Sequence, residues 1–473
     1  MQCCIELFAM PGIARFAAAA VVLVFFAGGC GRAPSSAALD LPIYFTCDTE
    51  GRLEPCGCFI GQFGGLSRLK TVLDSEATGA LRVDAGDAAA GHEDYDFIEY
   101  GYVLKAFAAM KYDALNVGSR EAQFSAAQLQ EIKRNSPVPV ISANLLDKAT
   151  QKPIFDSYRI VRRGSYSIGI IGVLDSNAVG DSLGDGLVVG DMDSAIQRSL
   201  AELRGKADMI VLLAFTDEAT LTRLAQDYYE CQVILGGKVS QPAQGLFRVN
   251  RSLVYFVTNE SRALGILRLR LVKDASLQVT TNEIRLLTDK IPQDTSIQKM
   301  LQDYRGQVRD TKLAVDDSNT LSADMVPGVR AAATYVGTQK CLSCHPSAAA
   351  VWSASAHAHA FDALAGRGAD ADPDCVRCHT VGFGEYSGYR REFAASHLVN
   401  VGCESCHGPG SLHVREMLGD KSIQFAFRPL ASGDCQKCHY GEFSRPFDWN
   451  RFWPLIQHGA EPRTLTTTIT GPQ

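Results

Sequence analysis

One short pattern, Cys-x-x-Cys-His, occurs four times in the last third of this chain. Two thiols at this spacing can form thioether bonds with the two vinyl groups of a haem, and the adjoining histidine then lies under the ring as an axial ligand of the iron. A structural zinc site is the alternative, since Cys-x-x-Cys is half of a zinc knuckle, but zinc requires no histidine directly after every second cysteine. The sequence therefore predicts four covalently bound haem c groups, held by Cys341, Cys344 and His345, by Cys375, Cys378 and His379, by Cys403, Cys406 and His407, and by Cys435, Cys438 and His439.

Length and composition narrow the class of protein. A chain of 473 residues exceeds what one hydrophobic core normally serves, so two or three domains are expected. With 46% apolar and 21% charged residues, it has the composition of a globular protein rather than of a disordered or membrane-embedded one. The net charge of −6 includes no long run of either sign, which argues against nucleic-acid binding and against polybasic membrane binding.

The N-terminus has the pattern of an export signal. Residues 16–29 form a short apolar segment that ends in small residues directly before Cys30. The segment resembles the lipobox of bacterial lipoproteins, which implies a signal peptide over residues 1–29 and a lipidated Cys30; a plain secretory signal is the alternative. Residues 30–40 would then be a flexible tether. The haem motifs agree with export, because in bacteria haem is attached to this motif outside the cytoplasmic membrane.

Residues 41–288 alternate between strand and helix patterns, which predicts an α/β layered domain with mixed sheets. Short apolar runs that end in Gly, Asp or Asn predict strands, and segments with helical periodicity lie between several of them. A hairpin is expected over 158–173, and further strands near 246–249, 253–258 and 266–272. The other expected strands are 42–47, 80–86, 113–118, 137–146, 166–174, 209–215 and 232–237, and the expected helices are 64–75, 97–110, 125–134 and 192–205.

The loops that follow these strands resemble the metallophosphoesterase domain of bacterial 5'-nucleotidases. The matching segments read CDTEG from Cys47, GGLSR from Gly64, DAGD from Asp84, YDALNVGSRE from Tyr112, SANL from Ser142, LLAF from Leu212 and LGGKVS from Leu235. The resemblance covers about half of the chain and implies a layered sandwich fold. In that family, imidazole and carboxylate ligands hold two divalent ions, which polarise a phosphate and bind the attacking water.

Most of those ligands are absent here. Only Asp48 and Asp87 match the family in kind, and Ser119 replaces an asparagine. Phenylalanine cannot coordinate a metal, and arginine and lysine would place positive charge where the ions belong. We therefore expect an inactive hydrolase scaffold without a divalent metal, in which Arg120 or Lys238 pairs with Asp48 and Asp87. The residues that stand in place of the family's histidines are Glu50, Arg120, Phe215, Lys238 and Ser240.

Three further cysteines, Cys47, Cys56 and Cys58, fall on the first of these loops. A disulfide from Cys47 to Cys56 or Cys58 is the expectation, with a thiolate metal or redox site as the alternative. Cys231 stands at the entry to a strand and is expected to be a buried apolar residue.

Residues 289–335 predict a helix and a linker, and residues 336–473 resemble the cytochrome c554 family. The resemblance rests on YVGTQKCLSCH with Trp352 and His357 behind it, on HTVGF after Cys378, on VGCESCHGPGSLH, and on WPLIQHG. It implies a mostly helical or irregular tetrahaem domain with distal ligands His357, His413 and His458. The Cys375 haem could take His397 or His359 as its sixth ligand, or stay open as one haem does in that family. In so short a domain, the porphyrins must supply much of the buried apolar surface.

These patterns favour an exported, lipid-anchored tetrahaem electron carrier at the periplasmic side or the outer surface of the cell envelope. Expected partners are redox proteins or quinone-linked donors, with no nucleic acid; self-association is left open. One alternative is an oxidoreductase that acts on a small nitrogen or sulfur compound at an open haem. Another is a 5'-nucleotidase-like hydrolase.

Overall fold

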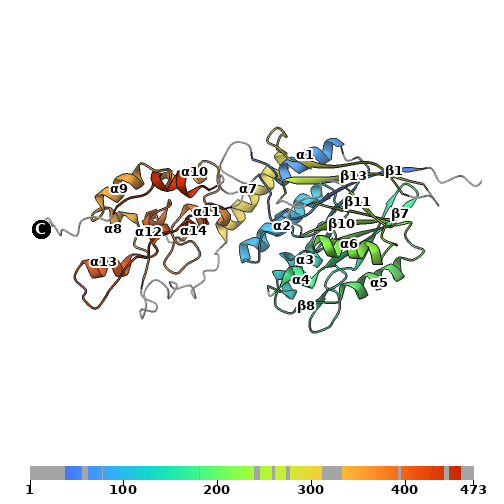
Figure 1. The fold of residues 1–473 in the computed structure, drawn as a ribbon, viewed down its shortest axis with the longest axis horizontal. Coiled ribbons are helices and arrows are strands. Elements are labelled where there is room, and N and C mark those ends of the chain that lie inside the picture. Colours follow the sequence, from blue (N-terminus) through green and yellow to red (C-terminus); the bar gives the residue numbers. More distant parts are fainter. Residues whose placement is uncertain are drawn as a thin grey trace, which may run out of the picture. The chain divides into compact units, whose positions relative to one another are not determined.

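The computed structural model describes residues 38–55, 62–76, 78–180, 182–238, 246–257, 261–272, 277–311, 333–391, 396–440 and 447–459. The expected signal peptide and Cys30, together with Cys56, Cys58 and Ser240, lie outside these residues. Residues 38–311 form what we call the α/β region, and residues 333–459 form the C-terminal region (Figure 1).

Two six-stranded sheets and one small sheet make up the strands of the α/β region. The first large sheet runs β14 (Gln278–Leu286), β13 (Ala263–Leu271), β1 (Leu39–Thr46), β2 (Leu81–Asp84), β3 (Ala114–Asn116) and β4 (Val140–Ile141). The second runs β11 (Phe247–Val249), β12 (Ser252–Phe256), β10 (Val233–Gly237), β9 (Met209–Phe215), β7 (Tyr166–Leu174) and β6 (Tyr158–Arg163). β5 (Leu145–Asp147) pairs with β8 (Leu187–Val189).

Both large sheets are mixed, as predicted. β1 pairs parallel to β2 but antiparallel to β13, while β7 pairs parallel to β9 but antiparallel to β6. The central strands are buried along their whole length because both faces of each sheet are covered. Phe45 of one sheet packs edge-on against Tyr255 of the other, with ring centroids 5.2 Å apart. The predicted layered sandwich is confirmed.

Helices cover the outer faces of the sandwich (Figure 1). Each amphipathic helix turns its apolar side to the core, as Ile196 and Leu203 do in α5 and Leu221 and Leu224 in α6. The helices of the α/β region are α1 (Leu66–Glu76), α2 (Asp94–Ala109), α3 (Ala126–Asn135), α4 (Ser176–Val179), α5 (Met192–Leu203), α6 (Glu218–Asp227) and α7 (Thr295–Asp310), with the 3-10 turn η1 (Glu121–Gln123).

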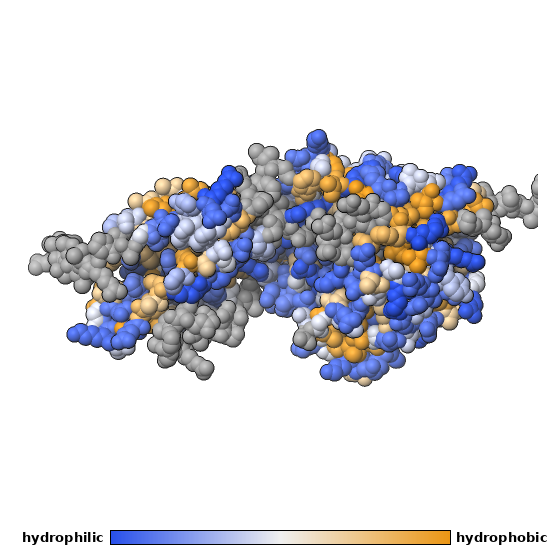
Figure 2. All heavy atoms as spheres, viewed as in Figure 1, coloured by the Kyte–Doolittle hydropathy of each residue, from blue (hydrophilic) through white to orange (hydrophobic). Residues whose placement is uncertain are grey.

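Short helices and irregular segments form the C-terminal region, as predicted. Its α-helices are α8 (Thr338–Leu342), α9 (Pro346–Ser353), α10 (Asp362–Ala365), α11 (Pro373–His379), α12 (Cys403–His407), α13 (Ser411–Met417), α14 (Ser432–Cys435) and α15 (Trp449–Phe452), with 3-10 turns η2 (Ala356–His359), η4 (Ser396–Leu398) and η6 (Trp453–Leu455). Figure 2 shows apolar residues at the surface of this region among hydrophilic ones. Leu418 is 79% exposed and Leu455 69%, which is unusual for residues of a self-sufficient core.

Candidate haem-binding site

A helical turn carries each Cys-x-x-Cys-His motif. The backbone N–H of His345 donates to the carbonyl of Cys341 at 3.0 Å, and that of His439 donates to the carbonyl of Cys435 at 2.9 Å. Residues three and four apart on a helical turn lie on the same side. The two thiols and the histidine of a motif can therefore approach one bound group together.

Three of the four motif histidines face a second histidine from a distant part of the chain. The ring centroids of His345 and His413 are 6.0 Å apart, those of His439 and His357 are 6.0 Å apart, and those of His407 and His458 are 5.9 Å apart. Two imidazoles bound at about 2 Å on opposite sides of one metal ion place their ring centroids roughly 6 Å apart. The three pairs thus have the spacing of two axial ligands of one iron.

The fourth motif histidine, His379, has a different environment. Its Nδ1 lies 2.5 Å from the carbonyl oxygen of Ala360, which fixes Nδ1 as the donor and leaves Nε2 for a metal. His397 lies against Gly337. His359 is exposed, with Nδ1 3.7 Å from Asp362. Within the described ranges, no ring contact joins His379 to another histidine.

The four motifs lie close together in two pairs, the first with the third and the second with the fourth, and the third and fourth motifs connect the pairs. The thiol of Cys403 raises the pKa of the Cys341 thiol, and that of Cys438 raises the pKa of the Cys378 thiol, so the members of each pair lie close together. Cys406 in turn lies within electrostatic reach of Cys435 and Cys438. The spatial order of the motifs is therefore first, third, fourth and second, which differs from their order in the sequence.

The surroundings of the paired histidines fit a bound haem. Burial lowers the pKa of His357, His407, His413 and His439, which favours the neutral imidazole that ligates metals. Phe427 packs against both His407 and His413, with ring centroids 5.4 and 5.1 Å away. Nδ1 of His407 is buried without a hydrogen-bond partner in the described structure. The apolar ring of Phe427 beside these imidazoles is the kind of wall against which a porphyrin face would pack.

One buried carboxylate, Glu404, organises the start of this region and was not foreseen from the sequence. It lies between the cysteines of the third motif and accepts hydrogen bonds from the backbone N–H groups of Val336, Gly337 and Gly410 at 2.7–3.1 Å. It thereby fixes the segment that leads into the first motif beside the third. Since this position varies freely in a Cys-x-x-Cys pattern, nothing in the sequence marks Glu404 as structural.

In the α/β region, the strand ends that resemble a two-metal site hold an ion-pair cluster. Arg120 Nη2 lies 2.8 Å from Glu50 Oε1, and Arg120 Nε lies 4.0 Å from Asp87 Oδ2. The Arg120 backbone N–H and the Ser119 hydroxyl also donate to Asp87, at 2.8 and 2.9 Å. The expected pairing of Arg120 with Asp87 is present, and Phe215 is fully buried.

Burial sets the electrostatics of this cluster. It raises the pKa of Asp87, with the nearby charge of Glu121 as the second cause, and it also raises the pKa of Glu121. Glu121 accepts hydrogen bonds from the backbone N–H groups of Asp87, Ala89 and Gly118, so it ties two loops together. In the part of the chain that the structure describes, no group of three or more His, Cys, Asp or Glu side chains is arranged to hold a metal ion.

The expected disulfide from Cys47 is not formed. Cys47 is a free cysteine, and its thiol donates to the carbonyl of Gly86 at 3.3 Å. Its sulfur points into the core against Gly237, where an added Cβ would come within 1.9 Å of it. Cys231 is buried, as expected.

Comparisons with known proteins agree with this division of the chain. Residues 340–408 match the family model described as cytochrome c554 and c-prime. Cytochrome c-554 of Nitrosomonas europaea is 43% identical over 93 residues, which cover 16% of this chain and 40% of that protein. The 5'-nucleotidase of Vibrio cholerae is 27% identical over 207 residues, which cover 40% of this chain and 36% of that protein. The chain thus spans two fifths or less of the length of these curated relatives.

Solved structures show the fold of the α/β region. A 5'-nucleotidase precursor from Thermus thermophilus superimposes with a TM-score of 0.51 at 21% identity, covering 66% of this chain and 68% of that one. The NAD nucleotidase of Haemophilus influenzae gives a TM-score of 0.51 at 17% identity, covering 59% of this chain and 62% of that one. The chain joins an α/β region with the 5'-nucleotidase fold to a C-terminal region that is similar to the cytochrome c554 family.

Proposed function

We propose that this protein is an exported, lipid-anchored tetrahaem cytochrome that relays electrons between redox partners at the cell envelope. Haem iron supplies one-electron chemistry when it is bound. The chain's own contribution is to hold each group through two cysteines and a histidine, and to bring the four motifs into contact. The cytochrome c554 match supports haem c in this region.

The observation that carries the proposal is the set of three histidine pairs with ring centroids 5.9–6.0 Å apart. We assign His345, His439 and His407 as proximal ligands, with His413, His357 and His458 as their distal partners. Two imidazoles saturate an iron and leave no position for a substrate, which suits electron transfer. The contacts between motifs support a continuous path through all four.

The α/β region serves in this proposal as an inactive scaffold or docking surface. Arg120 lies beside Asp87 and Glu50, where a divalent ion of a hydrolase would need the same carboxylates. A guanidinium that holds these oxygens competes with metal binding. We therefore expect the hydrolase to be inactive, with domains at residues 41–288 and 336–473 joined by residues 289–335.

Location and partners follow from the relatives and from the N-terminal pattern. A cytochrome c match together with 5'-nucleotidase relatives supports a place outside the cytoplasm, where haem is attached to this motif. None of the described helices is long and apolar enough to cross a membrane. We propose attachment through lipidation of Cys30, with redox proteins or quinone-linked donors as electron sources.

Low-temperature electron paramagnetic resonance of the oxidised protein tests the ligand assignment. We expect three low-spin irons, and the variants His413→Ala, His357→Ala and His458→Ala should each convert one low-spin signal to a high-spin one. His359→Ala is the matched control, because this histidine is exposed and faces Asp362. The proposal also requires that mass spectrometry of the mature chain show the added mass of four haems. A chain that carries fewer, or a distal variant with an unchanged spectrum, contradicts the proposal.

An oxidoreductase acting at the Cys375 haem is the second candidate, favoured by the unpaired environment of His379. Cyanide or nitric oxide should then change the spectrum of one iron only. If no iron responds to either ligand, the candidate fails and the relay stands. Hydrolysis is tested separately as release of phosphate from a nucleoside monophosphate, which we expect to be absent.

A further inference from the structure

A single carboxylate joins the helix of the second motif to the α/β region. Asp372 is the N-cap of α11, and its Oδ1 accepts a hydrogen bond from the backbone N–H of Asp374 at 3.3 Å. Its Oδ2 accepts one from Nε of Arg305, in α7, at 3.1 Å. The orientation of the helix that carries Cys375, Cys378 and His379 is therefore fixed from the other region.

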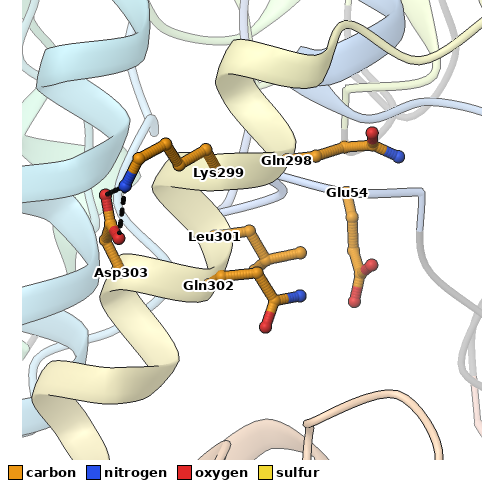
Figure 3. A pocket seen from close by; sticks show the side chains of 6 residues that line it. All are labelled: Glu54, Gln298, Lys299, Leu301, Gln302 and Asp303. Carbon is orange, nitrogen blue, oxygen red and sulfur yellow. Dashed lines mark hydrogen bonds and ion pairs between the residues drawn. The ribbon is translucent and has the colours of Figure 1, made fainter.

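Arg305 is almost completely buried at this contact. Its side chain is 4% exposed and that of Asp372 is 9% exposed. Its guanidinium also contacts Glu54, which is 43% exposed and belongs to the loop after β1. Figure 3 shows Glu54 beside α7 across a pocket of about 490 Å³, facing the side of the helix that carries Gln298 and Gln302. A buried charge is held in one geometry only when such partners surround it.

Two more contacts join the same segment to the α/β region. Arg52 Nη1 lies 3.6 Å from Asp374 Oδ2, and the guanidinium of Arg377 donates to the hydroxyl of Tyr95 in α2. Burial raises the pKa of the Cys375 thiol, and the charges of Asp372, Arg305, Asp374 and Glu54 lie close enough to shift it as well. Two of these four charges, Arg305 and Glu54, come from the α/β region.

We propose that the α/β region tunes one haem, the one attached to Cys375 and Cys378, by placing Arg305 and Glu54 beside its motif. This inference rests on the proposed function. When the iron takes up one electron, its net charge falls by one. A nearby cation then stabilises the reduced form and a nearby carboxylate stabilises the oxidised form. Arg305 should raise the reduction potential of this haem, and Glu54 should lower it.

Single charge changes in the full-length, haem-loaded protein test the proposal. The potential of each haem is measured by spectroelectrochemical titration with dithionite as reductant. The Cys375 haem is identified as the one whose signal is unchanged in the variants His413→Ala, His357→Ala and His458→Ala. Arg305→Met should lower the potential of that haem. Glu54→Gln should raise it, with little risk to folding because Glu54 is half-exposed. Asp372→Asn should also raise it, and Arg305→Met with Asp372→Asn should bring it back towards the wild-type value.

Arg309→Gln is the matched control. Arg309 lies on the same helix and pairs with Asp370 of the C-terminal region at 2.8 Å, but it is 37% exposed, so solvent screens its charge. It should leave all four potentials unchanged, and none of the variants should move the other three haems by as much as the Cys375 haem.

Opposite shifts for Arg305→Met and Glu54→Gln support the proposal, because a mere loosening of the interface would move the potential in one direction. Equal potentials in all variants, or shifts of the same sign, overturn it while leaving the electron relay intact. A wild-type protein without four haems contradicts the proposed function and this inference together.

Discussion

The two regions of this molecule are stabilised in different ways. In the α/β region, one continuous cluster of buried apolar side chains runs from Leu41 to Val308. In the C-terminal region, the buried apolar residues form one cluster of six and one of three. The C-terminal clusters are too small to be a self-sufficient core, as expected of a region in which the proposed haems supply much of the buried apolar surface.

Helix length points the same way. α8 and α12 have five residues each and α14 has four, far below the length at which an isolated helix is stable in water. α2 and α7, by contrast, have 16 residues each and pack against one another. The short helices need an external surface to pack on, and the attached porphyrins would supply it.

Removal of the haem attachment sites should have the largest effect and should act on the C-terminal region alone. We expect a full-length variant with all eight motif cysteines changed to alanine to lose the fold of the C-terminal region and to keep that of the α/β region. Limited proteolysis should leave a protected fragment that begins near Ala38 and ends near residue 311. A variant whose C-terminal region resists protease as well as the wild type does would show that side chains alone can hold it.

Truncation of one buried leucine in each region should show that the stabilities of the two cores are independent of one another. Leu213 in β9 and Leu412 in α13 are both buried. Leu213→Ala should lower the free energy of unfolding of the α/β region by about 2–5 kcal/mol, because it leaves a cavity in a continuous core. Leu412→Ala should leave that transition unchanged.

Urea unfolding followed with two probes can check this. Far-UV circular dichroism reports mainly on the α/β region, and haem absorbance reports on the C-terminal region. A loss of haem absorbance in step with the far-UV signal in Leu213→Ala would mean that the regions unfold as one unit.

A pH effect of smaller size should belong to the α/β region. Burial raises the pKa of Asp96 in α2 to about 6. The folded state then holds a proton that the unfolded state has lost, so stability is highest below pH 4 and falls as the pH rises through 6. The loss for this group is at most about 3 kcal/mol.

Thermal unfolding between pH 4 and 7 measures this slope. Asp96→Asn should flatten it, while Asp94→Asn, an exposed change in the first turn of the same helix, should not. Equal slopes in the two variants would show that Asp96 does not hold the proton.

Sequence periodicity was sufficient for most of the α/β region because its strands are bounded by Gly, Asp and Asn. It failed at residues 137–146, where one expected strand is two strands in different sheets, β4 and β5. Asn144 lies between them. Its side-chain amide donates a hydrogen bond to the carbonyl of Leu174 at 2.7 Å and accepts one from the backbone N–H of Leu174 at 3.0 Å. Such a turn is made by a tertiary contact, so local pattern cannot reveal it.

The parts of the candidate site that consist of a recognisable motif could be predicted from the sequence. The parts that depend on contacts between distant residues could not. The four cysteine-histidine motifs are evident from spacing alone. The partners His413, His357 and His458 came only from family resemblance, and Asp372 with Arg305 could not be seen at all. The direction of a side chain at a strand end, as in Cys47, also requires the packed structure.

Four non-glycine residues at the strand ends near Arg120 have left-handed backbone conformations: Asp48, Glu50, Asp87 and Lys238, with φ from 50° to 60°. Such a conformation costs about 1 kcal/mol per residue relative to glycine. The chain has therefore kept an energetically unfavourable loop path at this edge of the sandwich. Glycine at the exposed Lys238 should therefore recover part of this cost.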